Sequence, residues 1–142
     1  MQSQERDRIA AFLEGAVSAG ASSEEVAALV ATTLRCIDRA LTPIVGQRGT
    51  AALYKRSLHL SRPMHPWLPI AADGPESEMD VAALTAALAT RTSADAAAAG
   101  TQLLKSFSAL LATLIGESLT ERLLRPVWAT FLSGPSARDT KS

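Results

Sequence analysis

Charged side chains interrupt two apolar helical patterns in this sequence, and such charges can hold a partner or a ligand. Arg56 shares one helical face with Leu53, and Glu117 follows Leu114 at helical spacing. A buried arginine needs a partner, and its planar guanidinium fits a carboxylate. The spacing therefore predicts an ion pair between Arg56 and Glu117. The alternative donors are Arg48 and Arg122.

Two other interpretations of these charges stay open. In the first, the side chains lie at the edge of the apolar face and extend into water. In the second, they line a pocket between helices, where arginines facing a cavity would suit an acidic ligand. The residues of that pocket would be Arg48, Tyr54, Arg56 and Glu117.

The two histidines, His59 and His65, give little support to catalysis or metal binding. The sequence has neither a C-x-x-C nor an H-E-x-x-H motif, so we expect no metal. A phosphotransfer helix would need Lys and Gly after the histidine, and a globin would need a histidine after His65. An unfamiliar enzyme that uses Glu117 and His59 is the least favoured hypothesis. We therefore expect no enzymatic activity and no cofactor.

Five further residues have a structural interpretation that is simpler than a functional one. Cys36 follows the apolar spacing of its helix, which predicts a small buried side chain. Gly46 and Gly49 do not form a phosphate loop, because no strand precedes them; they indicate close helix packing or a helix start. Trp67 is interpreted as a cover over the core, with an aromatic anchor at a partner interface as the alternative. Trp128 has the same two interpretations.

Composition and charge favour one soluble helical domain. The 142 residues include 47% hydrophobic but only 4% aromatic residues, so the core must be aliphatic. The 14 basic and 14 acidic residues balance, which argues against nucleic acid as a partner. The sequence also shows no signal peptide and no apolar run long enough to span a membrane. With a single cysteine, a cytoplasmic location is expected.

Helical periodicity, capping residues and prolines divide the chain into elements. The first three predicted helices are residues 5–18, a helix that Ser22 or Ser23 caps and Pro43 ends or bends, and residues 47–61. They are followed by a short helix after a capping box at Ser77 and Asp80 and by a long helix from a cap at Ser93 to Gly116. A last helix covers residues 119–125, and Pro126 either kinks it or starts a final turn. The fold class is therefore all-α, a single-domain helical bundle of five to six helices. The domain would cover residues 1–132, with a flexible polar tail at 133–142.

Several strings between residues 42 and 128 resemble a family of small uncharacterised bacterial helical proteins. They are Thr42-Pro43-Ile44-Val45-Gly46-Gln47-Arg48-Gly49, Arg56-Ser57-Leu58 after Leu53, Pro66-Trp67-Leu68, Leu114-Ile115-Gly116-Glu117, and Arg122-Leu123-Leu124 with Trp128. The resemblance implies no catalytic activity and, at most, an accessory or signalling context.

The sequence thus favours a non-enzymatic helical interaction or regulatory module. Broad apolar faces on so short a chain favour a homodimer, and a further protein partner is also expected. The alternative is a sensing domain that binds a small acidic ligand between its helices. Candidate ligand or ion-pair residues are Arg48, Tyr54, Arg56, His59, Glu117 and Arg122.

Overall fold

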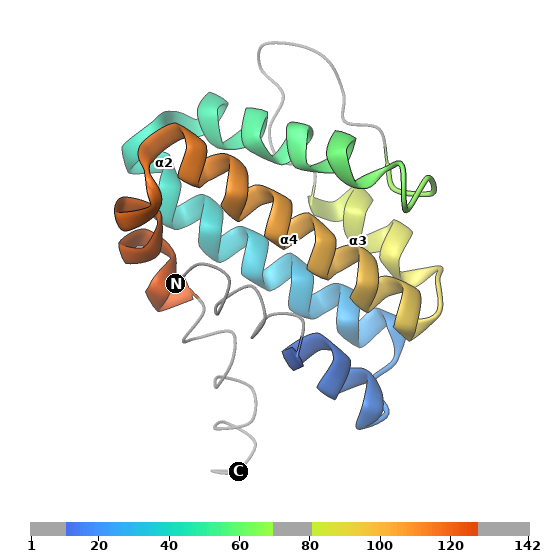
Figure 1. Cartoon of the computed structure of the whole chain (residues 1–142). Coiled ribbons are helices and arrows are strands. Elements are labelled where there is room, and N and C mark those ends of the chain that lie inside the picture. The colour runs from blue at the N-terminus through green and yellow to red at the C-terminus, as the bar shows by residue number, and fades with distance from the viewer. Residues whose placement is uncertain (1–10, 70–80, 128–142) are drawn as a thin grey trace.

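The computed structural model describes residues 11–69 and 81–127, and no strand occurs in these ranges. Three helices are α2 (Ser23–Ser61), α3 (Val81–Ala89) and α4 (Ser93–Ile115) (Figure 1). Residues 11–18 and 117–127 are also helical. The predicted all-α bundle is confirmed, and the five helices agree with the predicted five to six.

Helix α2 begins with a reciprocal capping box. The Ser22 side chain accepts a hydrogen bond from the Glu25 backbone N–H at 3.1 Å, and the Glu25 carboxylate accepts one from the Ser22 N–H at 2.8 Å. This arrangement satisfies two of the donors that a helix N-terminus leaves free. Next to it, the Ser23 hydroxyl donates to the Ala89 carbonyl at 2.8 Å, which ties the start of α2 to the end of α3.

A break at Gly46 divides α2 into two helices that run in different directions. Gly46 has φ 83° and ψ 161°, a backbone conformation that is essentially restricted to glycine. The sequence predicted that Pro43 ends or bends the first helix and that the next helix starts at residue 47. Helical structure continues past Pro43, and the break lies at Gly46, directly before that start. After the break, residues 47–61 turn back over the bundle, and in the view of Figure 1 α4 lies between the two halves of α2.

Helix α4 has a cap at each end. Thr92, rather than the predicted Ser93, is its N-cap and accepts a hydrogen bond from the Asp95 N–H at 3.0 Å. Gly116 ends the helix with φ 93° and ψ 155°, as the sequence predicted. The following helical residues are 117–127, so helical structure extends past residue 125, where the last predicted helix ended.

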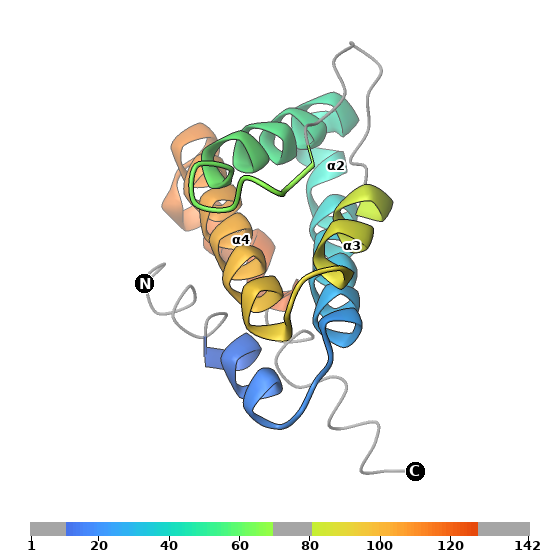
Figure 2. The same cartoon turned by 90° about the vertical axis from the view of Figure 1, so that its right-hand side faces the viewer.

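The core is aliphatic, and α2 supplies most of its contacts. Helix α2 packs against both α3 and α4, and Figure 2 shows its second half crossing above them. Tyr54 and Phe107 are the largest fully buried side chains. Helices α2 and α4 come especially close at Gly100, where a Cβ atom would lie 2.7 Å from Val30 Cγ2. Small residues on α4 therefore allow the close packing that the alanine-rich sequence predicts.

Helix α4 is long and apolar enough to cross a membrane by length and composition alone. Four of its large apolar side chains, Leu103, Leu104, Phe107 and Leu111, are nevertheless fully buried in the bundle. The core helix of a bundle has the same length and composition, so α4 is accounted for as a core helix.

Some predictions concern parts of the chain outside the described residues. They are the capping box at Ser77 and Asp80, the placement of Trp128, and the polar tail at 133–142.

Candidate functional site

Five of the six predicted site residues lie at the surface. The side chains of Arg48, Arg56, His59, Glu117 and Arg122 are exposed. No ion pair joins Arg56 to Glu117, and neither residue has an ion-pair partner within the described parts of the chain. The predicted buried pair is therefore wrong, and the alternative, in which the charges extend into water, describes both side chains.

Short hydroxyl side chains explain why Arg56 faces outward. The buried face of residues 47–61 contains Thr50, Ser57 and Ser61 beside Tyr54 and Leu58. Thr50 donates to the Gly46 carbonyl at 3.0 Å, and Ser57 donates to the Leu53 carbonyl at 2.8 Å. Because these hydroxyls bond to carbonyls four residues earlier, they can be buried at little cost. The sequence pattern predicted instead that the neighbouring helical face, which carries Leu53 and Arg56, is buried.

The break at Gly116 moves Glu117 away from the expected position. Glu117 was placed by continuing the helical spacing of Leu110 and Leu114 through the glycine. The chain changes direction at Gly116, so residues on its two sides do not share one helical face. Leu114 itself is 59% exposed, which shows that the apolar face of α4 ends before the break.

Tyr54 differs from the other predicted residues because it belongs to the core. Its side chain is 1% exposed, on the inner face of the second half of α2. The predicted pocket would need Tyr54 to share a cavity with Arg48 and Arg56, which are exposed on the same helix. The structure does not bring these side chains to one surface.

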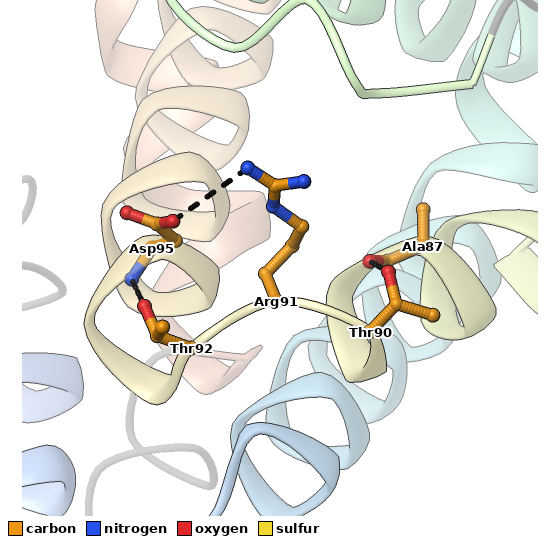
Figure 3. Close-up of polar contacts among 5 residues, drawn as sticks. All are labelled: Ala87, Thr90, Arg91, Thr92 and Asp95. Carbon is orange, nitrogen blue, oxygen red and sulfur yellow. Dashed lines mark hydrogen bonds and ion pairs between the residues drawn. The ribbon is translucent and has the colours of Figure 1, made fainter.

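A cluster that the sequence did not predict fixes the segment after α2 to the turn between α3 and α4. The Arg91 guanidinium carbon lies 4.8 Å from the centre of the Trp67 ring, and the His65 ring meets Trp67 edge-on at 5.9 Å. Arg91 also pairs with Asp95, with 3.8 Å between Nη2 and Oδ2 (Figure 3). Only tertiary structure joins Trp67 to Arg91, because they are distant in sequence and lie on different elements.

This cluster has the properties of a structural clamp. A cation on an aromatic ring at an exposed site contributes about 0.5–1 kcal/mol. Asp95 places a carboxylate 3.8 Å from the Arg91 guanidinium, and in this exposed pair it competes with any anionic ligand for the arginine. Trp67 packs against the core, so its predicted role as a cover is the one that these contacts favour.

Metal binding and thiol chemistry receive no support from the described part of the chain. Within residues 11–69 and 81–127, no group of three or more histidine, cysteine, aspartate or glutamate side chains could hold a metal ion. Cys36 is a free thiol that is partly buried and packs against the core.

Large apolar side chains are exposed where the two helix breaks occur. Ile44 is 51% exposed and lies two residues before Gly46. Leu114 is 59% exposed and lies two residues before Gly116, and Leu119 is 38% exposed and lies three residues after it. Both breaks lie at the same end of the bundle, on the left in Figure 1 and on the far side in Figure 2. We use the name break surface for five of the exposed residues that flank the two break glycines. It consists of Ile44, Arg48, Leu114, Glu117 and Leu119.

Comparison of the chain with protein-family models, curated proteins and solved structures found no match. The resemblance to small bacterial helical proteins therefore stays a prediction. The candidate site is defined by the geometry of this chain alone, and that geometry favours the break surface.

Proposed function

We propose that this chain is a non-enzymatic helical interaction module that acts as a homodimer in a signalling or accessory role. One observation carries the proposal: three of the five exposed large apolar side chains in the described residues, Ile44, Leu114 and Leu119, flank the two helix breaks, which lie at one end of the bundle. Grouped apolar side chains on a protein surface are typical of interaction sites. A twofold homodimer is the commonest assembly that covers such a surface.

The exposure of the charged residues weakens the sensing alternative. That alternative needs arginines that face an interior cavity and bind an acidic ligand there. Arg48, Arg56 and Arg122 are exposed instead. An interaction surface accommodates exposed charges around an apolar centre, because its rim is polar.

The test is the oligomeric state of the full chain, measured by native mass spectrometry and light scattering over a concentration series. We expect a dimer that Ile44→Gln and Leu114→Gln each weaken roughly tenfold or more, since both side chains would be buried on association. Glutamine is a good helix former, so the substitutions do not disturb the helices.

Leu60→Gln is the matched control. Leu60 is 42% exposed and lies on the same helix as the Gly46 break, but 14 residues beyond it. At 1.5 Å per residue this places Leu60 about 20 Å from the break. Its substitution should leave the dimer unchanged. A wild-type chain that stays monomeric at tens of micromolar would contradict the proposal.

A further inference from the structure

The segment that follows α2 has few attachments to the rest of the bundle. We call residues 62–69 the strap, which Figure 2 shows as the green trace after the end of α2. The contact of Trp67 with Arg91 places the strap beside the turn between α3 and α4. Leu68 is the only buried residue of the strap, and Met64 is 73% exposed.

The backbone hydrogen bonds of the strap stay within the strap and the end of α2. The Met64 and His65 N–H groups donate to the Ser61 carbonyl at 3.3 and 3.1 Å. The Leu68 N–H donates to the His65 carbonyl at 3.0 Å. Within the described residues, no hydrogen bond joins the strap to α3 or α4. The strap can therefore separate from these two helices without breaking a hydrogen bond.

Side-chain contacts hold the strap in place. Leu68 is 3% exposed, and Trp67 packs against the core. The Arg91 guanidinium carbon, 4.8 Å from the centre of the Trp67 ring, provides a contact from the turn between the helices. Segments with few buried apolar contacts and an exposed backbone typically open before the rest of a protein unfolds.

Buried polar atoms without a partner weaken the closed position at the origin of the strap. In the described parts of the chain, three buried side-chain atoms form no hydrogen bond, namely Ser61 Oγ, Arg62 Nε and Ser108 Oγ. Two of the three belong to the residues at which the strap leaves α2. A buried polar group without a partner costs free energy that hydration recovers. Arg62 belongs to the strap, so opening favours hydration of its Nε.

We propose that the strap opens as one unit while the helices of the bundle stay folded. Opening separates Trp67 from Arg91, and it gives solvent access to Leu68 and to the part of the core that Leu68 contacts. Prolines at positions 63, 66 and 69 restrict the backbone, which favours movement of the strap as one piece. The inference concerns a single chain and does not depend on the proposed homodimer.

Hydrogen exchange of the full chain, followed by NMR at several low urea concentrations, measures this opening. The amides of His65 and Leu68 are hydrogen-bonded in the closed strap, whereas the Leu104 amide lies in the core helix α4. We expect His65 and Leu68 to share one protection factor, roughly tenfold or more below that of Leu104. Their protection should also depend less on urea, because opening of the strap exposes less surface than global unfolding.

Leu111→Val separates opening of the strap from global unfolding. Leu111 is fully buried in α4 and lies 16 residues beyond Asp95, or roughly 24 Å along the helix. Its truncation destabilises the whole bundle, so the Leu104 amide should exchange roughly fivefold faster. The amides of His65 and Leu68 should keep their wild-type rates, because the closed and open states of the strap lose the same core contact.

Arg91→Gln tests the contact that holds the strap, because it removes the cation from the Trp67 ring. Exchange at His65 and Leu68 should become roughly two- to fivefold faster, which corresponds to the usual strength of an exposed contact of this kind. Asp95→Asn is the matched control. It removes the exposed ion pair but leaves Arg91 on the ring, so both rates should stay unchanged.

Several outcomes would overturn the inference. If Leu111→Val accelerates His65 and Leu68 together with Leu104, the strap opens only when the bundle unfolds. Different protection factors at His65 and Leu68 would show that the strap does not move as one unit, and no protection at either would show that it is not closed in solution. Wild-type exchange in Arg91→Gln would show that opening does not separate Arg91 from Trp67.

Discussion

At the scale of single residues, burial of short hydroxyl groups determined the orientation of the charged side chains. Serine and threonine look polar in a sequence, yet Thr50 and Ser57 are fully buried and donate to the carbonyls of Gly46 and Leu53. A hydroxyl that bonds to the carbonyl one turn earlier needs no other partner. This turns the second half of α2 so that Arg56 faces water instead of the core.

The first prediction concerns Arg56→Ala. Because Arg56 is exposed and has no ion-pair partner in the described residues, its removal should change the free energy of unfolding by less than about 0.5 kcal/mol. Tyr54→Ala, two residues away but on the buried face, should cost about 3–5 kcal/mol. Urea unfolding followed by circular dichroism measures both. A large loss for Arg56→Ala would restore the hypothesis of a buried ion pair.

At the scale of the elements, glycine conformation decides where the helices break. Proline was the expected signal in α2, but a proline inside a helix need only bend it. The break occurs three residues later, at Gly46. Gly116 has the same kind of backbone and ends α4. The two glycines thereby produce the change of direction that exposes Ile44 and Leu114 at one end of the bundle.

Gly46→Ala tests the importance of this break. A Cβ atom at Gly46 would have open space around it, so any effect must come from the positive φ and not from a clash. Such backbone strain costs about 1–3 kcal/mol, and we expect the free energy of unfolding to fall by that amount. Gly15→Ala is the control, since Gly15 lies in the helix at 11–18 with nothing near its would-be Cβ. It should be neutral or slightly stabilising. Equal stability of the two variants would show that the break carries no strain.

At the scale of the whole molecule, close packing of α2 on α4 holds the bundle together. The core contains few aromatic side chains, so burial depends on many aliphatic contacts between helices that lie close together. Among the described glycines, Gly100 has the neighbouring side chain closest to the position that a Cβ atom would take. That neighbour is Val30, which occupies the space that a side chain at Gly100 would need.

Gly100→Ala should therefore destabilise the fold, although alanine normally stabilises a helix relative to glycine by about 0.5–1 kcal/mol. The new Cβ would lie 2.7 Å from Val30 Cγ2, and overpacking of this kind costs about 1–3 kcal/mol. Adding Val30→Ala removes the clash, so the double variant should lose less stability than the two single losses combined. Denaturant unfolding of the wild type, the two single variants and the double variant gives the four free energies of unfolding from which this coupling is calculated. Additive losses would mean that the two helices adjust without strain.

The sequence by itself determined the fold class and most helix ends. Helical periodicity, an alanine-rich composition and the absence of strand patterns predict an all-α bundle, because these signals depend on neighbouring residues along the chain. The caps at Ser22 and Gly116 are local for the same reason. The break at Gly46 agrees with the predicted helix over residues 47–61 and with the interpretation of this glycine as a helix start.

Tertiary structure alone decided which face of each helix is buried and which side chains meet. The orientation of residues 47–61 depends on the direction that the chain takes after Gly46, and the position of Glu117 depends on the direction after Gly116. The contact of Trp67 with Arg91 joins two elements that are distant in sequence. Helical spacing carries no information across a break or between elements. The sequence therefore predicts which kinds of residue make up the core. Which side chains are exposed, and which of them meet, follows only from the folded structure.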